Sequence, residues 1–369
     1  MEDTIIKDPA KKGKEAATLA AFPVTQVARS RRKEVDFANL GFGKYFADHM
    51  LVADYADGEW KKVEIIPYGD LSISPANSAI HYGQSIFEGI KAYRDIDGHP
   101  LIFRPEKNWE RFAKSAQRLA MPVVPEEIFL DGMAQLVDLD KDWIPDAAGC
   151  SLYIRPFMFA MDAALGVRPS STYKFMIINS PAGAYYNKPV KLLVQDKYVR
   201  AFPGGTGFAK AAGNYAGSLM PALEVQEQGY DQILWIDGIE HKYLQECGTM
   251  NFFVLIGDTA ITPGLEEGTI LAGVTRDSII QLLKDRGIKV EERPVSIGEV
   301  LEAYDKGTLR EVFGTGTAAS ISYVAELTYR DKHLKFRPES WEISPAILQQ
   351  LNEIHVGKGD KYGWCRRVS

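Results

Sequence analysis

The stretch Leu101-Ile102-Phe103-Arg104-Pro105 decides the fold class, because a strand changes directly into a helix there. Its three leading apolar residues are typical of a buried strand. Pro105 suits the first position of a helix, where its fixed φ is already helical and its missing N–H is not needed. The helix that follows has an apolar face made of Trp109, Phe112, Ala113, Ala116 and Leu119.

Strands and helices of the same kind flank this stretch. From about Trp60 onward short apolar strands alternate with helical patterns, whereas roughly the first 35 residues lack periodicity and are expected to form an extended arm. Strands are expected at 151–157, 174–179, 191–195, 232–236, 251–256, 310–313 and 327–330, and a helix at 274–286. The mixture indicates an α+β or α/β protein.

The chain is long enough for two domains, with a linker at residues 181–189, which a proline bounds at each end. Residues 1–180 are expected to combine the N-terminal arm with a smaller α/β domain. Residues 190–369 are expected to form a larger domain with a mixed sheet.

Composition narrows the class of protein. The 369 residues are 46% apolar and 25% charged, as in an ordinary globular protein. A net charge of −6 without long runs of one sign argues against a nucleic-acid or membrane partner. No apolar stretch approaches the roughly 18 residues of a membrane-spanning helix, and the N-terminus has no apolar signal core. Three widely spaced cysteines fit the cytoplasm, and neither they nor the six histidines are spaced as metal ligands.

Lys210 is the first candidate for chemistry. It stands in Gly207-Phe208-Ala209-Lys210-Ala211-Ala212-Gly213-Asn214-Tyr215, among small and apolar residues that crowd out water. Desolvation turns a lysine into a nucleophile. Lysines also occur in such turns for structural reasons, so this segment alone leaves both interpretations open.

Two segments offer backbone N–H groups to an anion. Gly314-Thr315-Gly316-Thr317-Ala318-Ala319 matches the G-x-G-x-x-A turn of nicotinamide enzymes, although another strand follows it and not a βαβ unit. Its small residues still suit a phosphate or a carboxylate. Gly273-Val274-Thr275-Arg276 opens the helix at 274–286, where the first N–H groups lack intrahelical partners.

Glu246 is a candidate buried carboxylate, because it lies between an apparent strand and the apolar strand at 251–256. A buried carboxylate needs a cationic partner. A pyridinium nitrogen and an arginine would serve equally, and the residues alone do not choose between them.

Seven ordered motifs together resemble the class IV pyridoxal-phosphate aminotransferases. Residues 210–215, 246–251, 273–276 and 314–318 carry the resemblance in the second half, and residues 81–89, 103–105 and 153–156 are similar to the branched-chain amino acid aminotransferases in particular. The resemblance implies a two-domain, fold type IV pyridoxal-phosphate enzyme, like D-amino acid aminotransferase, whose larger C-terminal domain binds the cofactor.

The resemblance also implies cofactor contacts. Lys210 would form the Schiff base with pyridoxal phosphate and move the substrate proton, and Glu246 would keep the pyridine nitrogen protonated. Tyr215 would bond the phenolic oxygen of the ring. The phosphate would lie on Arg111, Val274, Thr275 and Thr317, although helical periodicity places Arg111 on the solvated side of its helix.

For the substrate, the resemblance implies that the carboxylate meets Tyr82, Thr317 and Ala318. An aromatic wall suited to aliphatic side chains would come from Phe87, Tyr153 and Tyr215. Arg155, which shares a strand face with Tyr153, would bind the second carboxylate of glutamate or 2-oxoglutarate. A partner-subunit loop closes the pocket in this family, and Leu165 and Val167 occupy the corresponding segment here, which predicts a homodimer.

The implied reaction is a reversible ping-pong transfer of the amino group of leucine, isoleucine or valine to 2-oxoglutarate. The nearest alternatives are a D-amino acid aminotransferase and an aminodeoxychorismate lyase, and Tyr153-Ile154-Arg155 argues against both. A nicotinamide oxidoreductase would use the Gly314 turn and would not need Lys210. A non-enzymatic binding protein is disfavoured, because every residue that the chemistry needs is present.

Overall fold

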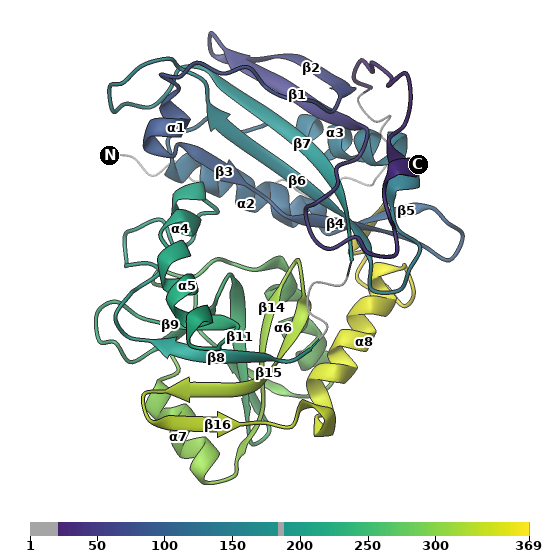
Figure 1. Cartoon of the computed structure of the whole chain (residues 1–369). Helices are drawn as coiled ribbons and strands as arrows, with labels where there is room; N and C mark the ends of the chain where they lie inside the picture. Colours follow the sequence, from purple (N-terminus) through teal and green to yellow (C-terminus); the bar gives the residue numbers. More distant parts are fainter. Residues whose placement is uncertain (1–20, 184–187, 369) are drawn as a thin grey trace, which may run out of the picture.

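The computed structural model describes residues 21–183 and 188–368 and places them in two halves, each built on one β-sheet (Figure 1). The first sheet has eight strands and the second has nine. Helices pack against both sheets, so the structure is of the α+β type, one of the two classes that the sequence indicates.

The first sheet is antiparallel, in the order β17-β5-β4-β6-β7-β1-β2 with β3 beside β6. Its strands are β1 (His49–Ala56), β2 (Glu59–Pro67), β3 (Ser85–Phe87), β4 (Ile90–Arg94), β5 (Pro100–Phe103), β6 (Ser151–Ala160), β7 (Tyr173–Ala182) and β17 (Cys365–Arg367). The sheet begins at His49, so regular strands start earlier than the expected Trp60.

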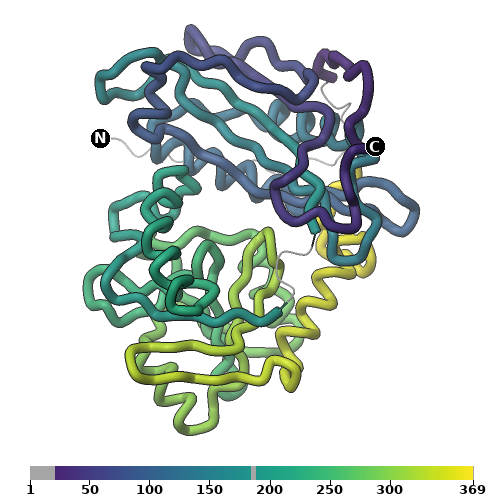
Figure 2. The backbone as a smooth tube through the Cα atoms, viewed as in Figure 1, coloured from purple at the N-terminus to yellow at the C-terminus, as the bar shows by residue number. Residues whose placement is uncertain are grey.

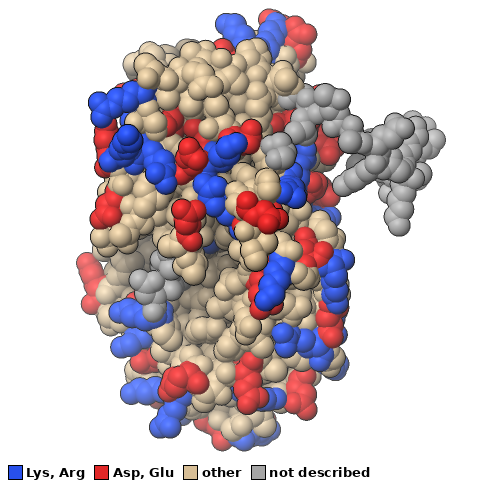
Figure 3. All heavy atoms as spheres, turned by 90° about the vertical axis from the view of Figure 1, so that its right-hand side faces the viewer, with Lys and Arg blue, Asp and Glu red and all other residues tan. Residues whose placement is uncertain are grey.

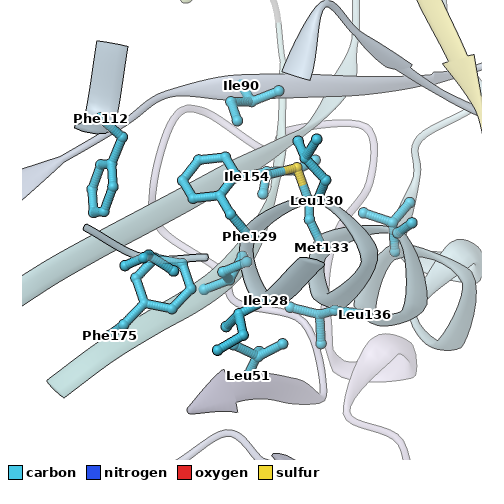
Figure 4. Packing of buried hydrophobic residues seen from close by; sticks show 14 of the residues in the cluster. Leu51, Ile90, Phe112, Ile128, Phe129, Leu130, Met133, Leu136, Ile154 and Phe175 are labelled. Carbon is cyan, nitrogen blue, oxygen red and sulfur yellow. The ribbon is translucent and has the colours of Figure 1, made fainter. Parts of the chain in front are cut away.

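The helices of this half are α1 (Ser78–Tyr82), α2 (Pro105–Arg118) and α3 (Glu126–Leu139), with short 3-10 turns η1 (Arg32–Glu34) and η2 (Lys141–Trp143). Pro105 occupies the first turn of α2, as predicted. Figure 4 shows α3 packed against the sheet, where Phe112, Phe129 and Phe175 form a cluster with ring centroids 5.4 to 5.8 Å apart. Burying each phenylalanine stabilises the fold by roughly 1.5–3 kcal/mol.

The second sheet is mixed, in the order β10-β9-β8-β15-β14-β11-β12-β13 with β16 beside β15. Its strands are β8 (Val190–Gln195), β9 (Gln232–Ile236), β10 (Leu244–Cys247), β11 (Met250–Ile256), β12 (Thr259–Thr262), β13 (Lys289–Glu292), β14 (Leu309–Gly316), β15 (Ser320–Tyr329) and β16 (Lys332–Lys335). The pairs β8–β9, β8–β15 and β12–β13 are parallel, so the predicted mixed sheet is confirmed.

The helices of the second half are α4 (Ala212–Ala216), α5 (Leu219–Glu227), α6 (Val274–Asp285), α7 (Ile297–Asp305) and α8 (Ile343–His355), with η3 (Pro338–Ser340). Both faces of strand β11 are covered. Phe252 packs in the cluster that contains Val300 of α7, whereas Phe253 packs in the cluster that contains Ile279 of α6 and Leu351 of α8. Two buried faces explain why residues 252–256 of β11 form a continuous apolar run.

Three sequence predictions need correction. Strand β14 continues through Gly316, beyond the predicted end at 313, so both glycines of the Gly314 segment lie in a strand and the turn is 317–319. The predicted strand at 327–330 is the end of the longer β15. Strand β7 extends to Ala182, so the first two residues of the expected linker belong to the first sheet. The domain boundary itself stays a prediction, and residues 184–187 and 1–20 lie outside the described residues.

The C-terminus returns to the first half. Helix α8 leads from the second half toward the first, and β17 then pairs with β5, as the path in Figure 2 shows. Within the described ranges, every helix is too short or too polar to cross a bilayer. On the face shown in Figure 3, acidic and basic side chains are interspersed.

Candidate active site

A cavity of about 620 Å³ is lined by residues from both halves of the molecule. The first half contributes Phe87, Tyr153 and Arg155, and the second contributes Lys210, Tyr215, Thr317 and Ala318. Seven of the residues singled out in the sequence therefore share one cavity, although they come from segments more than 200 positions apart.

The segment around Lys210 is fixed against the first half. The Lys210 N–H donates to Ser115 Oγ at 2.9 Å, and the Phe87 N–H donates to the Lys210 carbonyl at 3.1 Å. Its half-buried amine donates to the Tyr215 hydroxyl at 2.9 Å and lies 4.7 Å from the centroid of the Phe87 ring. The amine is thus held over an aromatic surface and beside a hydroxyl.

Glu246 is buried at the end of β10, directly across the hairpin from Asn251. Its Oε1 accepts from the Leu271 N–H at 2.8 Å, and its Oε2 lies 3.2 Å from Nε of Arg200. Burial raises the pKa of Glu246, and the Arg200 guanidinium opposes that rise. Arg200 is a partner that the sequence does not reveal, because no motif surrounds it. Glu246 also lines a small cavity with Tyr215, and a carboxylate can accept further donors.

Arg111 is 8% exposed, so the periodicity argument that placed it on the solvated side is wrong. The second half of the molecule covers that side of α2, and Nη1 of Arg111 donates to the Ala272 carbonyl at 2.9 Å. Nε and Nη2 donate to the two carboxylate oxygens of Glu88 at 2.8 and 2.7 Å. Sequence reasoning missed Glu88 as a partner, although it stands in the quoted motif at 81–89.

Glu88 is fully buried, and its pKa reflects two opposed effects. Burial alone would raise the pKa, but the Arg111 guanidinium holds it below its ordinary value. The pair is therefore ionised, and it fixes the direction of the guanidinium.

The start of α6 is open to an anion. The Asp277 N–H is bonded to the Gly273 carbonyl, and the N–H groups of the preceding first turn have no intrahelical acceptor. A side chain at Gly273 would place its Cβ 2.0 Å from Asn251 Oδ1, so this tight start requires glycine. Val274, Thr275 and Thr317 line one small cavity of about 20 Å³. Three of the four predicted phosphate contacts therefore line one cavity, and its lining does not include Arg111.

The aromatic wall follows from the alternation of β6. Tyr153 and Arg155 lie on the same face, and Nη2 of Arg155 donates to the Tyr153 hydroxyl at 3.1 Å. The Arg155 guanidinium lies 4.7 Å from the centroid of Phe87. A Cβ at position 89 would lie 2.2 Å from the Tyr153 hydroxyl, so Gly89 makes room for that ring. Phe42, from a segment without periodicity, meets Tyr153 edge-on at 4.8 Å and was not predicted.

Three predicted substrate residues lie elsewhere in the single chain. Tyr82, Leu165 and Val167 are 43%, 66% and 84% exposed, and the cavity lining does not include them. The Tyr82 hydroxyl donates to the Leu165 carbonyl, so α1 and the segment around Leu165 are in contact.

Comparison with known proteins gives the family. The family model described as amino-transferase class IV matches residues 85–327. Branched-chain-amino-acid aminotransferase 2 of Bacillus subtilis is 49% identical over 350 residues, which cover 93% of this chain and 96% of the relative.

Solved structures agree with this match. The branched-chain amino acid aminotransferase of Escherichia coli superposes with a TM-score of 0.72 at 28% identity, covering 87% of this chain and 99% of that one. The branched-chain aminotransferase of the archaeon Thermoproteus uzoniensis, solved with norvaline, also superposes with a TM-score of 0.72. Its sequence is 25% identical, and the match covers 86% of this chain and 100% of that one. The chain belongs to the class IV aminotransferases and, within them, to the branched-chain-amino-acid aminotransferase family.

Proposed function

We propose that this protein moves the amino group of leucine, isoleucine or valine to 2-oxoglutarate, with pyridoxal 5'-phosphate as its cofactor. The observation that carries the proposal is the cavity that places the Lys210 amine beside Tyr215 and the Phe87 wall, with Arg155 at 4.7 Å from the same ring. An amine, an aromatic wall and a cation together suit substrates that alternate between aliphatic and acidic side chains.

The residues fit the cofactor. Three of the five N–H groups of Arg111 are used by Glu88 and Ala272, which leaves two for a phosphate. Arg111 reaches the segment just before α6 through the Ala272 carbonyl, and the α6 start and Thr317 add donors at one small cavity. The buried Glu246 carboxylate suits a protonated ring nitrogen, which would share it with Arg200. When bound, pyridoxal phosphate supplies an electron sink as the substrate Cα loses its proton.

The residues of the chain itself would transfer the proton, orient the amine and exclude water. Lys210 would take the proton from the substrate Cα and deliver it to C4' of the cofactor, and in the second half-reaction it would move a proton from C4' to Cα of the new amino acid. The Tyr215 hydroxyl accepts a hydrogen bond from the Lys210 amine at 2.9 Å and so orients that amine. Phe87 and Tyr153 exclude water from the aliphatic side chain.

The charged substrate would use Arg155. Among the described residues Arg155 has no carboxylate partner, and its Nε is buried without a hydrogen-bond partner. A guanidinium in this state can donate a charge-assisted hydrogen bond to the second carboxylate of glutamate or 2-oxoglutarate. The substrate's own carboxylate would lie against Thr317 and Ala318 at the other wall.

A homodimer completes the proposal. Tyr82, Leu165 and Val167 are exposed in one chain and would close the cavity of the partner. The free state of all three cysteines fits the cytoplasm as the place of action.

The deciding experiment is the visible absorption spectrum of the purified protein. We expect a band from the lysine-bound cofactor that L-leucine bleaches and 2-oxoglutarate restores. Lys210→Ala should lose the band and the turnover, whereas the exposed Lys242→Ala should keep both. A band that responds to D-amino acids and not to leucine would contradict the proposal, as would near-normal turnover by Lys210→Ala.

A further inference from the structure

Ser115 is a fully buried serine inside helix α2. Its hydroxyl donates to the Arg111 carbonyl at 3.0 Å and accepts from the Lys210 N–H at 2.9 Å. The hydroxyl therefore acts as donor and acceptor at once, and its second partner lies 95 positions away in the chain. It joins α2 to the backbone of the residue whose amine lies in the cavity.

The helix itself does not require this serine. Serine has a lower helix propensity than alanine, and a hydroxyl that bonds the carbonyl four residues earlier slightly destabilises a helix. The neighbours Phe112 and Ala116 belong to the apolar core, where an alanine would pack without a polar group to satisfy. The hydroxyl is therefore explained by its bond to Lys210.

Both backbone groups of Lys210 are bonded to the first half of the molecule. Ser115 accepts from its N–H, and the N–H of Phe87 on β3 donates to its carbonyl at 3.1 Å. The next residue, Ala211, forms a β-bridge with Ile86. Of the hydrogen bonds to this backbone within the described ranges, only the one from Ser115 involves a side chain, so a substitution can remove it.

The same hydroxyl relates Lys210 to the proposed phosphate contact. The carbonyl that it bonds is that of Arg111, whose guanidinium is fixed by the buried Glu88. Under the proposed function, the cofactor is held at one end by Lys210 and at the other by Arg111. One turn of α2 therefore sets the spacing between these two attachments.

We propose that Ser115 is a positioning residue: its hydroxyl fixes the backbone of Lys210, so that the amine stands where it can take the proton from the substrate Cα. The inference rests on the proposed function, because it assigns this proton transfer to Lys210. Lysine has a flexible four-carbon stem. Tyr215 holds the amine at its tip, and Ser115 holds its base. A misplacement of about 1 Å can slow a reaction on the order of 100-fold.

Single-turnover kinetics of Ser115→Ala test the proposal. L-leucine should bleach the band of the lysine-bound cofactor about tenfold more slowly than in the wild type, because one orienting hydrogen bond is lost. The isotope effect of leucine deuterated at Cα should be at least as large as in the wild type, since the slowed step removes that proton. An unchanged rate, or a slower rate with a smaller isotope effect, would overturn the proposal.

Two further variants separate the hydrogen bond from packing. Ser115→Cys keeps a similar shape but offers only a weak acceptor, so it should be slow like Ser115→Ala. The matched control is Ser344→Ala on α8, because Ser344 is also fully buried and its hydroxyl has no hydrogen-bond partner within the described part of the chain. This control should bleach at the wild-type rate. Wild-type bleaching by Ser115→Cys would refute the proposal, because packing alone would then suffice.

Amide hydrogen exchange tests the contact without turnover. The Lys210 N–H is bonded in the wild type and should exchange slowly. In Ser115→Ala, one amide of a peptide covering residues 209–214 should exchange about tenfold faster. If the wild type fails to transaminate leucine, the proposed function fails, whereas this comparison still tests Ser115. Equal exchange in the two proteins would refute the role of Ser115 alone.

Discussion

At the scale of single residues, the site depends on ionic groups that depart from simple sequence patterns. Arg111 lies on the polar side of an amphipathic helix, where the pattern predicts exposure to solvent. Glu88 follows an aromatic residue in a strand-like segment. Both are buried because they neutralise each other with two hydrogen bonds. Breaking such a buried pair typically costs about 3–5 kcal/mol.

The pair gives a prediction with a matched control. Arg111→Ala should weaken binding of pyridoxal phosphate and also lower stability, because it removes a phosphate donor and leaves Glu88 unpaired. Glu88→Gln should lower stability by a few kcal/mol but keep cofactor affinity, since the Arg111 cation remains. Cofactor titration and urea unfolding of both variants check this. Equal cofactor affinity in wild type and Arg111→Ala would contradict the phosphate assignment.

At the scale of elements, helix α8 ties the two halves together. Its last residue, His355, is buried and stacks on Tyr93 of β4 at 4.4 Å, with Phe103 edge-on at 4.6 Å. Burial lowers the pKa of His355 to about 3. The imidazole is neutral in the folded protein, and its contacts are aromatic.

This burial predicts an acid-sensitive fold. Below about pH 6.5 His355 binds a proton in the unfolded chain but stays neutral in the folded chain. The stability of the fold therefore falls as the pH drops from there toward 3. His355 should account for a loss of about 2 kcal/mol between pH 6.5 and 5. In urea unfolding, the free energy of unfolding of His355→Phe should depend less on pH between about 6.5 and 5 than that of the wild type. The variant His333→Phe, at an exposed position, should follow the wild type. Parallel curves for wild type and His355→Phe would refute the assignment.

At the scale of the whole molecule, one side exposes apolar side chains from several elements. Ile80 of α1, Leu165 and Val167 of the loop between β6 and β7, and Leu219 of α5 are all at least 59% exposed. Helices α1, α4 and α5 lie on one side in Figure 1. A protein surface seldom leaves so many large apolar groups in water without a partner. A second copy of the chain is the partner that the proposed function needs.

Mixed dimers test whether the Tyr82 segment acts across the interface. Lys210→Ala and Tyr82→Ala are each expected to be nearly inactive. Refolded together, their heterodimer has one site with an intact Lys210 and an intact Tyr82 from the partner, so a 1:1 mixture should regain about a quarter of wild-type activity. If Tyr82 acts within its own chain, mixing restores nothing. Sedimentation of each variant checks that the dimer persists.

The sequence by itself determined the local elements and the chemical residues. Pro105 marks the start of α2, Gly287 follows the end of α6, and β9 and β11 are found within one residue of their expected ranges, because turn chemistry and apolar periodicity act between neighbours in the chain. The sequence motifs alone indicate Lys210, Tyr215, Phe87, Tyr153, Arg155, Thr317 and Ala318, and these residues line one cavity.

The tertiary structure alone decided which residues meet. The burial of Arg111 against Glu88 and Ala272, the pairing of Glu246 with Arg200, the entry of Phe42 into the cavity wall and the contact of Lys91 with Ala318 join segments far apart in the chain. Apolar periodicity predicts only which face of its own helix or strand a residue occupies. When a second layer of the molecule covers a polar face, burial and partners change, and only the packed fold contains that information.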